Sequence, residues 1–336
     1  MNRISKLQLA ALLLIGDAFA LFCLHGRICV MTAVGFSAGS LMQLFLALPL
    51  ARAYDRGRKL ADCGTIVRLV LLACVLMWGG ALFAMLREAS EVIYIPYERS
   101  GIFGRLAVAG LVASVCVYVS SSGIKALARS AVIAAGLGAV CVVIVTVSAA
   151  LQSDMENVIR PAGSSLWREL IRGFGASGGL GSFAVLLGFT ADDRTDTAVL
   201  YFTCKAVLSG VVLFTAVLVT GGIMEVLGFP VISAAQLSQP FPVQRTDSLF
   251  LVVFSVFAVY TAAVQASAAE YLAARTFPKL KRFRCTLALV IMAAAGAVMS
   301  APSRNTELYA AASLTALLIV PAEALLKGGV RKRERA

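Results

Sequence analysis

The feature that most constrains this chain is a series of apolar runs separated by short clusters of charged residues. Each run holds about 18–28 residues, which is enough to cross roughly 30 Å of hydrocarbon as a helix. The composition agrees, because 60% of the 336 residues are hydrophobic and 14% are charged. Transmembrane β-strands would instead alternate in polarity over about ten residues, and no such pattern occurs. The sequence therefore predicts an all-α polytopic membrane protein.

Apolar runs and their charged flanks predict ten transmembrane helices. No soluble domain fits between them, and the longest connection, 225–246, contains four glycines and prolines that predict an irregular loop. The ten spans are expected at about 7–25, 28–51, 65–86, 103–121, 128–151, 167–189, 199–226, 247–273, 285–301 and 307–326.

The basic residues predict how the chain lies in the membrane. Placing both termini in the cytoplasm puts about twice as many of them on that side, as the positive-inside rule requires. The net charge of +12 then reflects topology and lipid headgroups, and a nucleic-acid partner has little support. The tail 327–336 is expected to be a basic cytoplasmic anchor. Lys205, several residues into the seventh span, is expected to snorkel to the cytoplasmic surface.

Residues typical of enzymes and of metal sites are scarce. The eight cysteines lie in or beside spans without a CxxC pair, and the single histidine, His25, lies at the end of the first span. No zinc-protease, nucleophile-elbow or P-loop motif occurs, and no pair of catalytic carboxylates is evident. We therefore expect no enzymatic activity, no catalytic residues, no cofactor and no metal.

The stretch "GFGASGGLGSFAVLLGF", residues 173–189, places six glycines in an apolar span. One explanation is close packing, because Gly175 and Gly179 form a GxxxG pair that lets two helices approach. The other is a broken helix, since each glycine costs about 1 kcal/mol of helix propensity. Unpaired backbone at membrane depth is tolerated where it lines a cavity, and its peptide groups can then bind a polar solute. The glycine content favours the broken helix.

A matching interruption is expected in the other half of the chain. The first span contains "LLLIGDAFALF", with Gly16 and Asp17 near its middle. A carboxylate at that depth costs about 3 kcal/mol unless it is solvated or paired. Asp17 is accordingly either a site residue or a buried structural partner. Five spans in each half, about 7–151 and 167–326, give the layout of an inverted repeat within a single membrane domain.

Several stretches resemble a known family. These are "ISKLQLAALLLIGDAF" at the start, "VYVSSSGIKALARSAVIA" (117–134), "ENVIRPAGSSLWRELIRG" before the sixth span, and the loop 227–263 with Arg245, Thr246 and Asp247. Together they resemble the endospore germination permease family, the B subunits of spore germinant receptors, within the amino acid/polyamine/organocation (APC) transporter superfamily. Asp17 departs from that pattern, because apolar or small residues are usual there.

The resemblance implies a LeuT-like fold, a 5+5 inverted repeat with interrupted helices 1 and 6. It also implies a subunit that binds a nutrient, often an amino acid, and signals spore germination. Its partners would be a larger membrane subunit and a lipoprotein, in the bacterial cytoplasmic membrane or spore inner membrane. No nucleic acid is expected.

In this fold the solute pocket lies at mid-membrane between spans one, three, six and eight. Polar groups at that depth can equally serve hydrogen bonds between helices or packing, and Trp78 can equally face lipid or the core. The candidate substrate-binding residues are Ile15, Gly16, Asp17, Ala18, Met77, Trp78, Gly175, Ser177, Gly178, Gly179, Gly181, Tyr260, Thr261 and Gln265. The coupling candidates are Asp17 and Arg129, although Arg129 is also explained as a cytoplasmic loop charge.

Three functions follow. The first is the permease-like subunit of a germinant receptor. The second is a proton-coupled secondary transporter of amino acids or polyamines, with Asp17 binding the proton or an amine. The third is a structural membrane protein in which the glycines only pack helices.

Overall fold

The computed structural model describes most of the chain. The described residues are 4–57, 60–93, 102–152, 165–176, 179–221, 228–237, 247–277, 284–299, 301–302 and 305–333.

Each of the ten predicted spans contains a helix or, for 167–189, a bent pair of helices. Among the described residues six helices are long and apolar enough to cross a membrane on their own, and the bent pair makes a seventh. The helices are α1 (Lys6–Phe22), α2 (Val30–Asp55), α3 (Thr65–Ile93), α4 (Ile102–Ser121), α5 (Ile124–Gln152), α7 (Leu166–Ala176), α8 (Leu180–Leu186), α9 (Arg194–Thr220), α10 (Pro230–Leu237), α11 (Asp247–Thr276), α12 (Arg284–Val298) and α13 (Thr306–Arg333), with short 3-10 turns η1 (Leu60–Asp62) and η2 (Leu187–Phe189).

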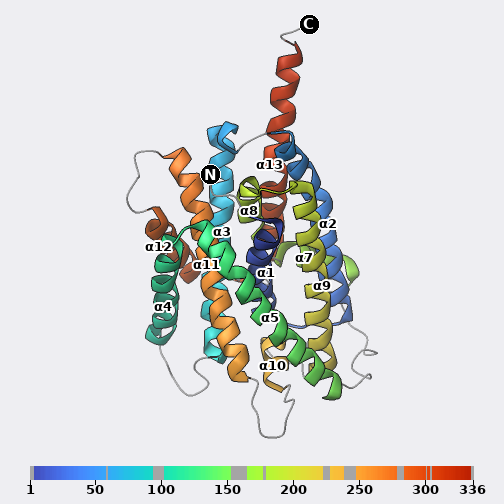
Figure 1. Cartoon of the computed structure of the whole chain (residues 1–336). Coiled ribbons are helices and arrows are strands. Elements are labelled where there is room, and N and C mark those ends of the chain that lie inside the picture. Colours follow the sequence, from blue (N-terminus) through green and yellow to red (C-terminus); the bar gives the residue numbers. More distant parts are fainter. Residues whose placement is uncertain are drawn as a thin grey trace.

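The first helix lies at the centre of the bundle (Figure 1). It packs against α5, α9 and α11, and most of its residues are buried on every side. Helix α2 packs on α9 and α7, while α3 packs on α11 and α12. A helix that is apolar all round is expected to be enclosed by others, which is the position that α1 takes.

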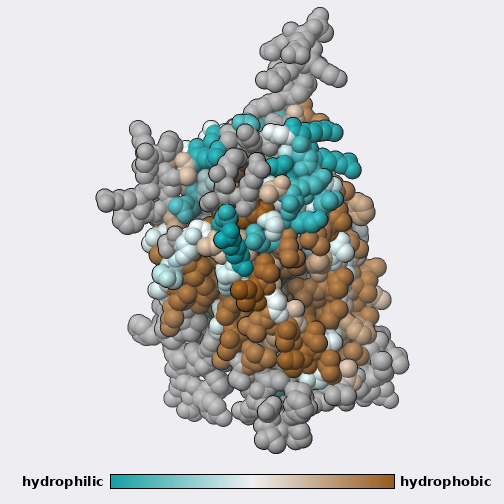
Figure 2. Space-filling view, in the orientation of Figure 1, coloured by the Kyte–Doolittle hydropathy of each residue, from teal (hydrophilic) through white to brown (hydrophobic). Residues whose placement is uncertain are grey.

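The outer surface of the bundle is apolar. Large side chains such as Tyr118, Ile133 and Val298 are exposed on α4, α5 and α12. Figure 2 shows a broad hydrophobic band below a hydrophilic cap. Because hydrocarbon is a solvent for such side chains, this surface is suited to face lipid. The protein is a multi-pass membrane protein.

The predicted interruption of the first helix at Gly16 and Asp17 is wrong. Helix α1 is continuous from Lys6 to Phe22. A Cβ atom at Gly16 would lie 3.3 Å from Thr261 of α11, so this glycine allows two helices to pack closely. Asp17 remains in a regular helix because its carboxylate is paired, as described below.

The connection 225–246 is also not wholly irregular. It contains α10, which begins at Pro230 and packs on α9. Proline is well tolerated in the first turn of a helix, where its missing N–H group has no partner in any case. Buried residues such as Ile232 then hold this short helix against the bundle. Arg245, singled out in the sequence, lies outside the described residues.

Two of the glycines of the sixth span serve close helix packing. A Cβ atom at Gly173 would lie 2.5 Å from the Cα atom of Phe36 on α2, and one at Gly175 would lie 2.5 Å from the carbonyl oxygen of Thr306. On the facing side, a Cβ atom at Gly39 would lie 2.8 Å from the backbone nitrogen of Phe174. The packing explanation therefore holds for the α7 half of the stretch.

Both ends of the α7–α8 pair are tied to the ends of α1. Arg172 of α7 donates hydrogen bonds to the carbonyl oxygens of His25 (2.7 Å) and Arg27 (2.9 Å), just after α1. Before α1, the N–H group of Ile4 donates to the carbonyl oxygen of Phe189 (3.2 Å), and Ala191 donates back to Ile4 (2.9 Å). The broken span and the central helix therefore form one connected unit.

Candidate solute-binding site

The sixth span is interrupted near the middle of its length. Helix α7 ends at Ala176, α8 begins at Leu180, and the two are bent by 49°. Gly179 precedes α8 with non-helical backbone angles (φ −80°, ψ 83°). Ser177 and Gly178, two of the predicted site residues, lie outside the described residues. The prediction of a broken sixth helix is confirmed.

Side chains of α2, α8 and α11 form hydrogen bonds around the interruption. Gln43 of α2 donates through Nε2 to the carbonyl oxygen of Phe174 at 2.7 Å. The hydroxyl of Ser182 donates to the carbonyl oxygen of Gly179 at 2.6 Å. Gln265 of α11 donates through Nε2 to the Ser182 hydroxyl at 3.0 Å. Such partners are what allows a helix to end inside the hydrocarbon region.

A hollow lies beside this interruption, bounded by α1, α3, α8, α9 and α11. It is compact in this conformation, with room for about one water molecule. A solute therefore requires the surrounding side chains to move apart. The described residues that line it are Leu12, Leu13, Gly16, Trp78, Leu82, Gly179, Ser182, Tyr201, Thr261, Val264 and Gln265.

Two polar side chains of this lining have an atom without a hydrogen-bond partner among the described residues. They are the indole N–H of Trp78 and the carbonyl oxygen Oε1 of Gln265. Their exposed fractions are 1% and 3%. A buried polar atom without a partner costs about 1–3 kcal/mol, and a guest that hydrogen-bonds to either atom would recover that cost. Thr261 differs, because its hydroxyl donates to the carbonyl oxygen of Phe257 in its own helix.

A buried ion pair lies directly behind the hollow. The ammonium Nζ of Lys205 on α9 is 3.0 Å from Oδ1 of Asp17, and the two side chains are 0% and 1% exposed. Tyr201 donates its hydroxyl hydrogen to Oδ2 of Asp17 at 2.7 Å. Because Tyr201 also lines the hollow, its hydrogen bond to Asp17 connects the ion pair to the hollow.

The expectation that Lys205 snorkels to the surface is wrong. A lysine in a membrane span extends its ammonium group to the surface when no nearby group compensates its charge. Here the Asp17 carboxylate compensates that charge inside the bundle. Lys205 also lies 5.5 Å from the ring centre of Tyr201 and 5.7 Å from that of Phe202, at distances typical of cation–π contacts. Asp17 is therefore a buried partner of another helix.

The structure places five of the predicted residues in the lining of the hollow, and the other described candidates are not part of that lining. Gly16, Trp78, Gly179, Thr261 and Gln265 line it. Their role in binding a solute stays a prediction. Trp78 faces the core, where its ring packs against Tyr309 with 5.3 Å between ring centres.

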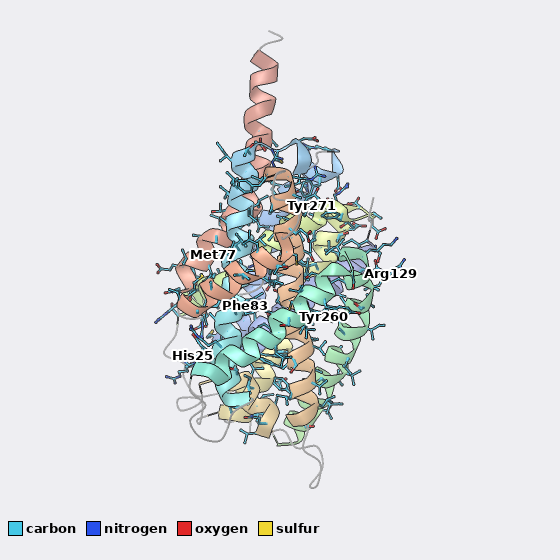
Figure 3. All side chains as sticks on the ribbon, turned by 90° about the vertical axis from the view of Figure 1, so that its left-hand side faces the viewer. His25, Met77, Phe83, Arg129, Tyr260 and Tyr271 are labelled. Carbon is cyan, nitrogen blue, oxygen red and sulfur yellow. The ribbon has the colours of Figure 1, made fainter. Side chains whose placement is uncertain are left out.

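Apart from Asp17, the remaining candidates among the described residues lie in packed positions or at the periphery of the bundle. Ile15 and Ala18 are buried in the hydrophobic core, and Gly175 and Gly181 pack against α13 and α3. Met77 and Tyr260, labelled in Figure 3, are partly buried against that core and are not among the residues that line the hollow. Figure 3 also shows Arg129 at the edge of the bundle, where its side chain is exposed.

Tyr201 and Lys205 are the residues that sequence reasoning missed. They are four positions apart, so they share one face of α9. A tyrosine and a lysine on one face of an apolar span form a polar stripe that needs a partner at the same depth. Asp17, an isolated acid in another apolar span, is the signal that could have identified that partner.

The broken span, the central helix α1 and the enclosed hollow define an all-helical polytopic membrane protein with a LeuT-like fold. No protein-family model matches the sequence, and no curated protein sequence matches it. Solved structures do. Mhp1, described as a nucleobase-cation-symport-1 family transporter in a closed conformation with bromovinylhydantoin bound, is similar with a TM-score of 0.60 and 16% identity, over 93% of this chain and 76% of that one.

Two further structures agree. The inward-facing conformation of Mhp1 has a TM-score of 0.58 and 14% identity, over 95% of this chain and 76% of that one. A Na⁺-coupled sialic acid symporter in a substrate-bound outward-open state has a TM-score of 0.57 and 11% identity, over 95% and 74%. At these identities the likeness defines the fold alone, and membership of the germination permease family stays a prediction.

Proposed function

We propose that this chain is a secondary transporter that carries a small polar solute through the hollow between α1 and the broken span. The observation that carries this proposal is the juxtaposition of two features at mid-depth: a hollow with unpartnered polar atoms, and a buried ion pair one hydrogen bond behind it. Structural neighbours with the same fold are described as transporters and symporters, which supports the same class of activity.

The ion pair is suited to couple transport to protons. The Lys205 ammonium already compensates the Asp17 carboxylate, so a metal cation at this carboxylate would have to displace it. A proton can instead bind to Asp17 once a change of conformation admits water to the pair. The Tyr201 hydroxyl would transmit that change to the wall of the hollow. An amine of a polyamine finds no free carboxylate here.

Two other functions have weaker support. The role as a subunit of a spore germinant receptor, with a larger membrane subunit, a lipoprotein and a spore inner membrane location, rests on the sequence resemblance alone. A purely structural role does not explain why Trp78 and Gln265 each have a buried atom without a hydrogen-bond partner among the described residues, since such atoms lower stability. Neither alternative nor the transporter involves an enzymatic step, and the proposed orientation keeps both termini in the cytoplasm.

The test is uptake into liposomes that contain only the purified full chain. Labelled alanine, putrescine and uracil are each supplied under an inward proton gradient, an inward sodium gradient, or neither. We expect one solute to accumulate under the proton gradient. The matched variant is the double substitution Asp17→Asn with Lys205→Met, which removes both charges together and leaves no buried charge unpaired. It should bind solute and exchange it while losing proton-driven accumulation.

The possible outcomes separate the parts of the proposal. Accumulation driven by sodium alone would contradict proton coupling and leave the transporter in place. Solute binding without any uptake or exchange would contradict transport and favour the receptor subunit. Absence of both binding and uptake would favour the structural role.

A further inference from the structure

The hollow is uncharged, although an aspartate and a lysine lie behind it. The described residues that line it are all neutral at pH 7. Asp17 and Lys205 compensate each other at 3.0 Å, and the Tyr201 hydroxyl is already committed to Asp17. The nearest charges therefore offer a solute no free ionic partner.

A buried site of this kind disfavours ionic solutes. Moving a carboxylate or an ammonium group out of water costs several kcal/mol unless an opposite charge or several hydrogen bonds meet it. A zwitterionic amino acid brings two such groups, and a polyamine brings at least two ammonium groups. Neither finds compensation among the described lining residues, whereas an uncharged solute needs none.

Hydrogen bonding around Ser182 determines which atom of Gln265 is free. Ser182 donates its single hydroxyl hydrogen to the carbonyl oxygen of Gly179 at 2.6 Å. It can then only accept from Gln265, so the amide nitrogen of Gln265 must face it, at 3.0 Å. The opposite end of that amide, the acceptor Oε1, has no partner among the described residues.

The indole of Trp78 supplies the complementary group. Its N–H is a donor only, and it too has no partner in the described part of the chain. One free donor and one free acceptor match a solute that offers a carbonyl oxygen and an N–H group. An amide edge carries both. Trp78 and Tyr201 also give the hollow aromatic surface, which favours a flat ring.

We infer that the hollow binds a small, flat, uncharged solute with an amide edge, such as a cyclic amide or a pyrimidine base. The Trp78 N–H donates to the solute carbonyl, and the Gln265 carbonyl accepts from the solute N–H. This inference rests on the proposed function and replaces the amino acid or polyamine expected from the sequence.

The test is binding of defined probes to the purified full chain, measured as thermal stabilisation and as displacement of labelled uracil. The neutral probes are uracil, succinimide and 2-pyrrolidone. The matched control compound is 1,3-dimethyluracil, which keeps the ring and both carbonyl groups but has no N–H. Alanine and putrescine represent the charged alternatives. We expect at least one of the neutral probes to bind, and dimethyluracil, alanine and putrescine not to bind.

Three variants assign the contacts. Trp78→Phe keeps an aromatic ring and removes the N–H, and Gln265→Leu removes the acceptor. Each should weaken binding of the neutral probe about tenfold, as expected for one buried hydrogen bond. Thr261→Val is the control, because the Thr261 hydroxyl is already used within its own helix. It should change affinity less than about twofold.

Failure of this inference is distinguishable from failure of the proposed function. Binding of alanine or putrescine in place of all three neutral probes overturns the inference, while uptake of that solute keeps the transporter. Unchanged affinity in both Trp78→Phe and Gln265→Leu overturns the assigned contacts. No binding of any probe, together with no uptake, overturns both proposals.

Discussion

Helix α1 and the α7–α8 pair border the same hollow but contribute to it in opposite ways. Helix α1 keeps a continuous backbone and places a charged side chain, Asp17, at mid-depth. The α7–α8 pair has no charge near its interruption among the described residues, and its main-chain carbonyl groups are bound by Gln43 and Ser182. One element bends its backbone and the other keeps a charge. The Asp17 carboxylate is paired by Lys205 of α9, whereas the carbonyl groups at the interruption are bound by Gln43 of α2 and by Ser182 of α8 itself.

The comparison explains why similar sequence signals had different outcomes. A glycine next to an acid suggested a break in α1, but close packing against Thr261 and the ion pair with Lys205 account for both residues. Six glycines suggested a break in the sixth span, and there the helix does end. A single glycine costs about 1 kcal/mol of helix propensity, and close packing readily offsets that cost. The summed cost of several glycines in one segment is larger than close packing can offset.

The largest effect is expected from separating the two charges. Asp17→Asn removes the carboxylate that lies 3.0 Å from the buried Lys205 ammonium, and Lys205→Met removes the ammonium from that buried carboxylate. Either change should lower the free energy of unfolding by about 3–5 kcal/mol. Thermal melting of the protein in detergent measures it. The double variant should recover most of the loss, and a double variant as unstable as the sum of the two single changes would contradict a direct ion pair.

The packing half of the glycine stretch is tested by Gly173→Ala. The added methyl group would lie 2.5 Å from the Cα atom of Phe36, where only a shift of backbone can relieve the overlap. We expect a loss of about 1–3 kcal/mol in the free energy of unfolding. Gly188→Ala is the matched control, since no atom lies within 4 Å of the added group. Equal melting temperatures for the two variants would show that α2 and α7 do not pack this closely.

The bound carbonyl at the interruption is tested by Gln43→Leu. The substitution keeps the apolar part of the side chain and removes the donor to the carbonyl oxygen of Phe174. A loss of about 1–2 kcal/mol is expected in the same melting measurement, because a buried carbonyl loses its partner. Ser130→Ala is the control, since its hydroxyl bonds only within its own helix. A variant as stable as wild type would mean that this hydrogen bond contributes nothing to holding the broken span.

The smallest effect is expected at Gly16. Alanine should be accepted in the continuous helix α1, because a gain of about 1 kcal/mol in helix propensity offsets a tight contact at 3.3 Å with the Thr261 methyl group. We therefore expect a change of less than about 1 kcal/mol in the free energy of unfolding. A larger loss would show that α1 and α11 cannot move apart to accommodate the added methyl group next to Thr261.

The sequence by itself determined the features that depend on a residue's own neighbours along the chain. Long apolar runs place the helices of the membrane bundle, since a helix is the only single segment that satisfies its own backbone in hydrocarbon. The glycine run places the interruption before Leu180, because helix propensity is a local property.

Tertiary structure decided which distant groups meet. Asp17 is paired by Lys205 and by Tyr201, which lies 184 positions away. Trp78 and Gln265, each with a buried atom that has no partner among the described residues, line one hollow from separate helices. Burial of a polar group is tolerated only with a suitable partner, and helix packing determines which partner that is.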